Sequence, residues 1–186
     1  MAEERTIEGK TLLVTGANRG LGAALVEAAF ARGAAKIYCG ARDVARFGAA
    51  LDRFDGRAVP VQLDVTSESD VAAAVAALSD LDILVSNAGV TYMVPLLETT
   101  MQGARDTMEA NFFGPLRLVQ AFGPRLDARN GGFVSVLSLA ALVPAQAAEL
   151  YSASKAAGVM LGHAARLALP NVAVALAYPG LMDTDM

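Results

Sequence analysis

Cysteine, histidine and tryptophan are almost missing from this sequence of 186 residues. It has one cysteine, Cys39, one histidine, His163, and no tryptophan. A single cysteine cannot form an intrachain disulfide, and one cysteine with one histidine do not make a zinc-type cluster. We therefore expect neither a disulfide framework nor a metal site. Cys39 lies in an apolar segment and is expected to be a small buried side chain.

Long apolar runs and runs of one charge are also missing. No apolar stretch approaches the ~20 residues that a membrane-spanning helix needs, and the first residues lack the pattern of a signal peptide. Acidic and basic residues are interspersed, and the formal net charge is −4. A nucleic-acid-binding protein would instead show a basic patch or stripe. We expect a soluble cytoplasmic protein that binds neither nucleic acid nor a membrane.

Aliphatic residues are abundant, since 54% of the chain is hydrophobic. This composition is typical of parallel strands that are covered on both faces. The apolar runs predict strands at Lys10–Thr15, Lys36–Ala41, Ala58–Leu63, Ile83–Ser86, Gly132–Leu137 and Val172–Ala177. Helical patterns predict helices at Leu21–Arg32, Val44–Phe54, Ser67–Leu78, Met101–Leu126 and Ser152–Leu169. The span Gly123–Gly132, which is rich in glycine, reads as a surface connection.

This alternation of strands and helices predicts one α/β domain over residues 1–186. Repeated βα units with short connections specify a parallel sheet with right-handed crossovers. Six strands make a doubly wound, Rossmann-type sheet, most simply in the order 3-2-1-4-5-6. The chain is long enough for one substantial core and too short for two.

A glycine-rich turn follows the first expected strand. It reads Gly16-Ala17-Asn18-Arg19-Gly20-Leu21-Gly22. Glycines permit tight backbone geometry and close approach of a ligand, while the first N–H groups of a helix attract phosphate. The spacing differs from the more usual Gly-x-Gly-x-x-Gly fingerprint. The turn predicts a dinucleotide site, and a plain strand-to-helix connection is the alternative.

A second motif, Tyr151-Ser152-Ala153-Ser154-Lys155, places a phenol and an ammonium four residues apart. At helical spacing the two side chains share one face. A free tyrosine titrates near ~10, and a nearby cation favours the phenolate. Such a phenol, with the Ser138 hydroxyl upstream, suits proton transfer to or from a carbonyl oxygen. The alternative is an ordinary solvated helix face.

Further segments complete a pattern that resembles the short-chain dehydrogenase/reductase family. Ser86-Asn87-Ala88-Gly89 resembles that family's Asn-Asn-Ala-Gly motif and departs from it at Ser86. The other stretches that carry the resemblance are the turn Thr15-Gly16-x-x-x-Gly20-x-Gly22, the ordered set Asn111, Ser138, Tyr151 and Lys155, and Pro179-Gly180 followed by Thr184. Together these motifs run from Thr15 to Thr184.

The resemblance implies hydride transfer between a nicotinamide and a carbonyl or alcohol carbon of a small molecule. Tyr151 then exchanges the proton, Ser138 bonds the same oxygen, and Lys155 assists the phenol and holds the nicotinamide ribose. Asn111 is implied to hold a water that relays protons to Lys155, and its alternative role is a backbone hydrogen bond in a bent helix. The alternative function is a non-catalytic NADP-binding sensor or regulatory protein of the same fold.

The resemblance also assigns residues to the rest of the cofactor. Asn18 and Leu21 belong to the diphosphate turn, and residues 87–89 line the cleft. Asp64, followed by Val65, contacts the adenine or else caps its own turn. Pro179, Gly180 and Thr184 are assigned to the nicotinamide end.

The end of the second expected strand favours NADP(H) over NAD(H). An NAD-type site has an acidic residue about 20 residues beyond the glycine turn. The resemblance assigns Ala41 to that place in this chain, and Arg42 follows immediately. Arg19, inside the turn, is a second cation for the 2′-phosphate, because arginine suits phosphate through its forked donors. Asp43, displaced along the strand, is an alternative partner for the ribose.

Two expectations concern assembly and the carboxyl end. Family members commonly pair the helices expected at Met101–Leu126 and Ser152–Leu169 across a two-fold axis, so we expect a homodimer or homotetramer. Members also continue into a substrate-covering lobe and a final strand, whereas this sequence stops at Met186. We expect that a C-terminal part has been lost or is disordered, and a minimal family member is the alternative.

Overall fold

Six parallel strands form one sheet in the computed structural model, which describes residues 6–181. The strands are β1 (Thr11–Thr15), β2 (Lys36–Ala41), β3 (Ala58–Gln62), β4 (Ile83–Ser86), β5 (Gly132–Val136) and β6 (Ala173–Ala177). Their order is β3-β2-β1-β4-β5-β6, and every neighbouring pair is parallel. The predicted doubly wound sheet and its order are confirmed, and each strand end lies within one residue of its prediction.

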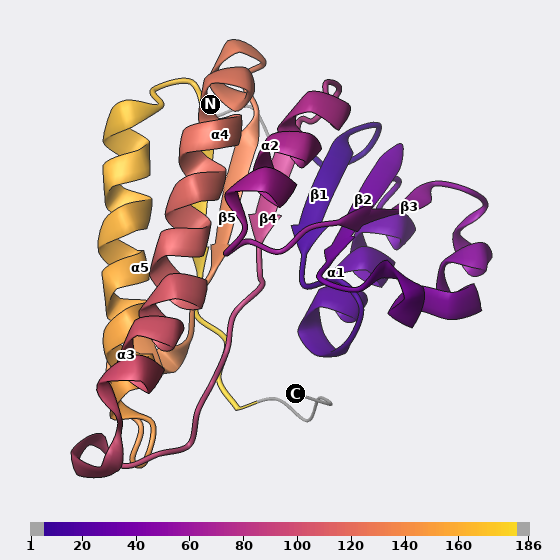
Figure 1. Cartoon of the computed structure of the whole chain (residues 1–186). Coiled ribbons are helices and arrows are strands. Elements are labelled where there is room, and N and C mark those ends of the chain that lie inside the picture. The colour runs from indigo at the N-terminus through magenta and orange to yellow at the C-terminus, as the bar shows by residue number, and fades with distance from the viewer. Residues whose placement is uncertain (1–5, 182–186) are drawn as a thin grey trace.

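Helices cover the two faces of the sheet (Figure 1). The helices α2 (Glu68–Ala77), α4 (Gly114–Ala128) and α5 (Glu149–Ala168) lie over one face, while α1 (Gly20–Ala31) and the 3₁₀ helix η1 (Val44–Phe54) lie over the other. The shorter elements are η2 (Leu96–Glu98), α3 (Met101–Met108), the π-helical segment η3 (Glu109–Phe113) and η4 (Leu139–Ala141). Within residues 6–181, no helix is long and apolar enough to cross a membrane.

The side chains of β1 alternate between two apolar cores. Leu13 packs with Leu84 and Phe122 on the face that α2, α4 and α5 cover. Leu12 and Val14 pack on the face that α1 and η1 cover. All five residues of β1 are buried, and the strand order reverses between β1 and β4. Open α/β sheets bind ligands at such a switch point, outside the carboxyl ends of the strands.

Cys39 lies at the centre of β2 and is fully buried, as predicted. Burial raises the pKa of its thiol to about 12, because the thiolate would lose its hydration. Cys39 is therefore a protonated, small apolar side chain of the core.

The predicted helix Val44–Phe54 is instead a 3₁₀ helix that is broken at Gly48, where φ is +48° and ψ is −132°. Phe47 and Phe54 are both buried. Their spacing of seven residues matches two α-helical turns. The sequence pattern therefore predicted a helical segment with the correct bounds and the wrong helix type.

The prediction for the span Gly123–Gly132 was partly wrong, because α4 continues to Ala128. Gly123 is buried inside that helix, and a Cβ added there would lie 3.1 Å from Leu169. This glycine permits close packing of α4 and does not mark a turn. The predicted helix over residues 101–126 is also divided, since η3 separates α3 from α4.

Candidate functional site

The glycine turn lies at the carboxyl end of β1 and leads directly into α1. Gly16 and Gly20 have φ values of +65° and +52°, a region that strains residues with a Cβ. A Cβ added at Gly22 would lie 2.0 Å from the Gly16 carbonyl oxygen. The first turn of α1 has no acidic residue, and its N-cap residue Arg19 makes no side-chain capping bond. The helix N-terminus therefore keeps N–H groups and a positive dipole end for a diphosphate.

Gly22→Ala is expected to weaken dinucleotide binding by at least about tenfold, because the new methyl group must displace the Gly16 carbonyl from the turn. A fluorescence titration with NADPH measures the effect. Gly132→Ala is the matched control, since a Cβ there lies at an ordinary contact distance, 3.5 Å, from Ile83. Equal losses in the two variants would contradict the role of the turn.

Thr15 and Asn87 tie the end of β1 to the end of β4. The Thr15 hydroxyl oxygen accepts the N–H groups of Asn87 and Ala88, each at 3.0 Å. The Asn87 amide donates to the carbonyls of Thr15 at 2.9 Å and Gly16 at 3.3 Å. These bonds hold the glycine turn beside the loop of residues 87–89. Thr15 was not predicted as a site residue, and its place immediately before the glycine turn was the available signal.

A cavity of about 600 Å³ lies at the carboxyl ends of β1 to β4. Every cofactor residue predicted in the first half of the chain lines it, namely Gly16, residues 18–22, Arg42, Asp64, Val65 and residues 87–89. We call it the cofactor cavity, because the predicted cofactor residues line it. Thr66, Val90 and Ala110 also line it and were not predicted. Each of these three is adjacent in sequence to a predicted residue, which was the signal that could have identified it.

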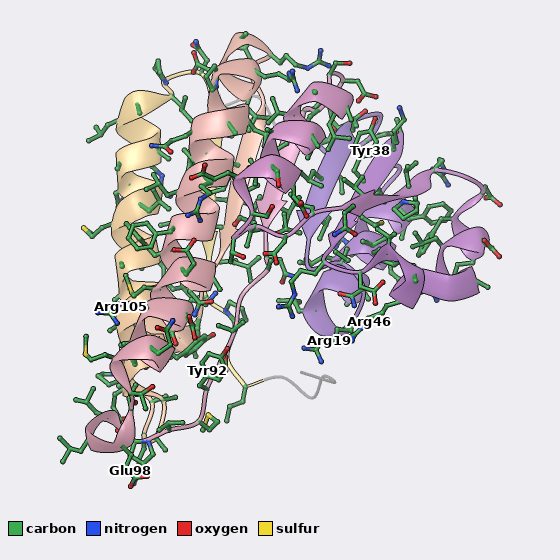
Figure 2. The ribbon with its side chains drawn as sticks, in the orientation of Figure 1. Arg19, Tyr38, Arg46, Tyr92, Glu98 and Arg105 are labelled. Atoms are coloured by element: carbon green, nitrogen blue, oxygen red, sulfur yellow. The ribbon has the colours of Figure 1, made fainter. Side chains whose placement is uncertain are left out.

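Near the carboxyl end of β2 the cavity has two arginines, and the nearby Asp43 carboxylate is already engaged by other groups. Arg19 and Arg42 both line the cofactor cavity, and Arg19 projects from the edge of the sheet where the strands end (Figure 2). The Asp43 carboxylate accepts the Ala45 N–H at 3.1 Å and lies 3.4 Å from the Arg46 guanidinium. Asp43 thus caps η1, and it is not among the residues that line the cavity.

Asp64 makes the capping bonds that were the alternative to a contact with adenine. One of its carboxylate oxygens accepts both the N–H and the hydroxyl of Thr66, at 2.9 Å and 2.8 Å. Asp64 also lines the cofactor cavity. Its second oxygen can therefore still face a bound nucleotide.

Tyr151 and Lys155 both lie in α5, and their predicted shared face is confirmed. The Lys155 Nζ atom lies 5.7 Å from the centre of the Tyr151 ring. Lys155 is only 6% exposed, and its ammonium donates to the Val136 carbonyl at 3.0 Å. Burial lowers the pKa of Lys155 to about 8. Since an ammonium has three donors, two N–H groups remain without a partner among the described residues.

Asn111 lies in the π-helical segment η3 and is 3% exposed. Its amide oxygen accepts the Val90 N–H at 2.8 Å, and its nitrogen donates to the Val90 carbonyl and to the Ser154 hydroxyl oxygen, both at 2.9 Å. Ser154 donates in turn to the Tyr151 carbonyl at 2.6 Å. Asn111 therefore makes the backbone hydrogen bonds that were its alternative role. Ser154 was missed, although it lies inside the Tyr151–Lys155 motif.

Gly89 connects the cofactor cavity to these catalytic candidates. A Cβ added at Gly89 would lie 2.9 Å from the Asn111 amide oxygen and 3.4 Å from Lys155 Nζ. The position has no room for a side chain. The backbone that lines the cavity at Gly89 therefore lies directly beside the Lys155 ammonium.

Ser138 follows β5 and begins η4. Its hydroxyl oxygen accepts the Ala140 N–H at 3.1 Å, and within residues 6–181 its own proton has no acceptor. The Leu139 N–H bonds to the Pro179 carbonyl at 2.9 Å, which places the Pro179-Gly180 segment beside the Ser138 loop. Pro179 and Gly180 do not line the cofactor cavity as it stands. Thr184 lies outside the described residues.

Comparison with known proteins agrees with this geometry. The sequence profile of the short chain dehydrogenase family matches residues 10–186. The short-chain dehydrogenase PC-15 of Penicillium crustosum is 37% identical over 169 residues, covering 88% of this chain and 61% of the relative. L-fucose dehydrogenase of Oryctolagus cuniculus is 35% identical over 175 residues, covering 90% and 60%. The chain thus spans about three fifths of the length of the curated relatives that it matches.

Solved structures of short chain dehydrogenases superpose closely on the chain. A short chain dehydrogenase from Burkholderia cenocepacia, solved in complex with NADP, superposes with a TM-score of 0.90 at 40% identity, covering 98% of this chain and 76% of its own. A short chain dehydrogenase/reductase from Burkholderia phymatum, solved in complex with NAD, has a TM-score of 0.88 at 27% identity, covering 97% and 68%.

Proposed function

The chain belongs to the short-chain dehydrogenase/reductase family, and on that premise we propose that it is an NADP(H)-dependent oxidoreductase. It transfers a hydride between the nicotinamide and a carbonyl or alcohol carbon of a small molecule. The observation that carries the proposal is the buried Lys155 ammonium. This group lies beside the Tyr151 ring and next to Gly89, which lines a cavity that suits a dinucleotide.

Each catalytic candidate has a role that fits its contacts. The bound nicotinamide supplies or accepts the hydride, while the protein supplies position and the proton. In the reduction direction, Tyr151 donates a proton to the developing alkoxide. Ser138 donates a hydrogen bond to the same oxygen, because its hydroxyl proton has no acceptor among the described residues and the Ala140 N–H holds its oxygen in place. The two remaining N–H groups of Lys155 hold the nicotinamide ribose, and its charge stabilises the phenolate that forms.

Asn111 is a positioning residue in this mechanism. It holds the Val90 backbone at the cofactor cavity and, through Ser154, the first turn of α5. π-helical turns frequently occur at functional sites, and η3 allows this asparagine to reach both partners. The water that relays protons to Lys155 is part of the proposal and rests on the family resemblance.

We propose NADP(H) as the preferred cofactor because Arg19 and Arg42 line the cavity while Asp43 is engaged as a cap. Arg42→Asp is expected to shift the relative binding free energy toward NADH by about 2 kcal/mol, since a charge-assisted contact is lost and a repulsive charge is added. Titration of each variant with both cofactors measures the shift. Arg42→Gln should give an intermediate shift, and equal affinities of the parent protein for NADPH and NADH would contradict the assignment.

The proposed assembly is a homodimer or homotetramer that pairs α4 and α5 across a two-fold axis. Met160 and Leu167 lie seven residues apart on α5 and are 63% and 88% exposed. Apolar side chains at this spacing form one stripe of the helix, and the isologous contact would cover it. Light scattering at micromolar concentration is expected to give the mass of a dimer or tetramer. The mass of a monomer would contradict the proposal.

The most direct screen of the proposed activity is NADPH oxidation with a panel of aldehydes, ketones and quinones. Turnover of at least one carbonyl class is expected. Tight NADPH binding with no turnover by the complete parent protein would instead favour the sensor or regulatory function.

A further inference from the structure

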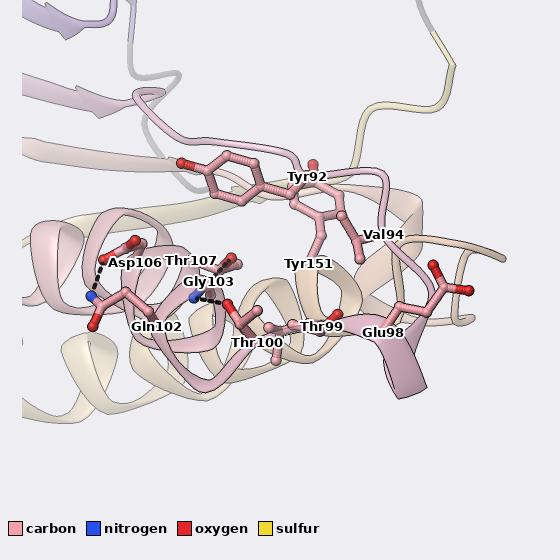
Figure 3. A pocket seen from close by; sticks show the side chains of 11 residues that line it. Tyr92, Val94, Glu98, Thr99, Thr100, Gln102, Gly103, Asp106, Thr107 and Tyr151 are labelled. Atoms are coloured by element: carbon pink, nitrogen blue, oxygen red, sulfur yellow. Dashed lines mark hydrogen bonds between the residues drawn. The ribbon is translucent and has the colours of Figure 1, made fainter.

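A second cavity lies beside Tyr151, between α3 and the loop that follows β4 (Figure 3). Its volume is about 400 Å³, and the Tyr151 ring forms part of its wall. Among the described residues, Tyr92 is the one that lines both this side cavity and the cofactor cavity. Tyr92 is half exposed. A molecule whose reacting carbon lies at the cofactor can therefore extend past Tyr92 into the side cavity.

The side cavity carries two carboxylates and no positive charge among the described residues that line it. The Glu98 carboxylate has no hydrogen bond or ion pair with any described residue, and Asp106 accepts one bond, from the Gln102 amide nitrogen at 2.8 Å. The hydroxyls of Thr99 and Thr107 both donate to backbone carbonyls. No lysine, arginine or histidine of the described chain lines the cavity. The acceptors without a partner among the described residues are thus the Glu98 oxygens, one Asp106 oxygen and the Gln102 carbonyl. The free donors are the Thr100 hydroxyl, the second Gln102 N–H and the hydroxyls of Tyr92 and Tyr151.

The walls of the side cavity complement these acceptors. The rings of Tyr92 and Tyr151 both line the cavity (Figure 3), and Val94 adds an aliphatic surface. Aromatic rings pack against a carbon skeleton, while spaced oxygen acceptors take protons from hydroxyl groups along that skeleton. A single ammonium would satisfy one carboxylate and leave the other acceptors unpaired. Several hydroxyl groups, spaced along a chain, match the whole set, because each hydroxyl can both donate and accept.

We infer that the side cavity binds a polyhydroxylated chain that carries no anionic group, the part of the substrate distant from the reacting carbon. Its volume is within the range of small-molecule sites. Glu98 and Asp106 reject a carboxylate or phosphate on that chain by like charge. The role as a substrate subsite rests on the proposed function, whereas binding of the chain itself does not require catalysis.

The test compares sorbitol, gluconate and glucamine, which share a carbon skeleton and differ in charge at one end. Binding to the NADP⁺-loaded parent is measured by ligand-observed NMR. Sorbitol is expected to bind at least about tenfold more tightly than gluconate, because like charges repel. The double variant Glu98→Gln/Asp106→Asn should reduce this discrimination to about twofold. The control variant is Glu68→Gln, because Glu68 lies at the start of α2 and does not line the cavity. This variant should preserve the discrimination between sorbitol and gluconate.

The ring of Tyr92 gives a second, independent readout. Tyr92→Ala is expected to weaken sorbitol binding, whereas Tyr92→Phe keeps the ring and should preserve it. Equal affinities for sorbitol and gluconate, weaker binding of glucamine than of gluconate, or absence of sorbitol binding would each overturn the inference. Carbonyl turnover without sorbitol binding would leave the proposed function intact. Sorbitol binding without turnover of any carbonyl compound would support the inferred binding site and overturn the proposed function.

Discussion

Replacing Tyr151 with phenylalanine is expected to lower carbonyl turnover by at least about 10²–10⁴-fold, because the transferable proton is removed. The developing alkoxide also loses a hydrogen-bond donor, which adds to the loss. The ring stays in place, so the NADPH dissociation constant should change by no more than about twofold. Steady-state kinetics and a fluorescence titration measure the two quantities separately.

Tyr38→Phe is the matched control for this substitution. The Tyr38 hydroxyl bonds to Asp80 at 2.8 Å, and Tyr38 does not line either cavity. Turnover by the control should therefore stay close to that of the parent protein. Turnover by Tyr151→Phe that equals the turnover of the control would exclude Tyr151 as the proton donor.

Lys155→Met is expected to differ from Tyr151→Phe by impairing cofactor binding as well as turnover. The Lys155 ammonium lies beside the Tyr151 ring and has two N–H groups that no described residue uses. Its removal deprives the ribose of charge-assisted bonds and the phenolate of a neighbouring cation. We expect NADPH affinity to fall by about tenfold and turnover by at least about 10²-fold. Unchanged NADPH affinity would contradict the ribose contact.

The lowered pKa of Lys155 predicts that NADPH affinity depends on pH. Burial lowers the pKa of Lys155 from 10.5 to about 8, so the cofactor-free protein loses this charge as pH rises through about 8. NADPH affinity of the parent should therefore decline above that pH, while Lys155→Met should show a flatter profile. Folding stability has the opposite trend. The unfolded chain binds the extra proton between about 8 and 10.5, so the stability of the parent relative to Lys155→Met should rise with pH over that interval.

The sequence predicted the strands and the cofactor cavity well because both depend on local pattern. Buried parallel strands are short continuous apolar runs, and each strand was located to within one residue. Ligand groups gather at the carboxyl ends of such strands. Gly16, residues 18–22 and residues 87–89 could therefore be placed at one cavity before any tertiary contact was known.

The sequence did not predict features that depend on tertiary packing. Gly123 resembled a turn residue, yet it is buried in α4 because Leu169 packs against it. Ser154 lay inside a predicted motif, but its bond to Asn111 joins residues 43 positions apart. The side cavity joins Tyr92, α3 and the start of α5, and no single stretch of sequence carries a pattern for it.

The central claim is hydride transfer from a nicotinamide bound at the Gly16–Gly22 turn, with proton donation by Tyr151. The measurement that tests it most directly uses NADPH that carries deuterium on the transferred position of the nicotinamide. A carbonyl compound that is reduced in the screen is incubated with this cofactor, and the alcohol is analysed by mass spectrometry. The account predicts one deuterium on the former carbonyl carbon with the parent protein and almost no product with Tyr151→Phe. An unlabelled alcohol, or bound NADPH that never transfers its deuterium to any carbonyl compound, would contradict it.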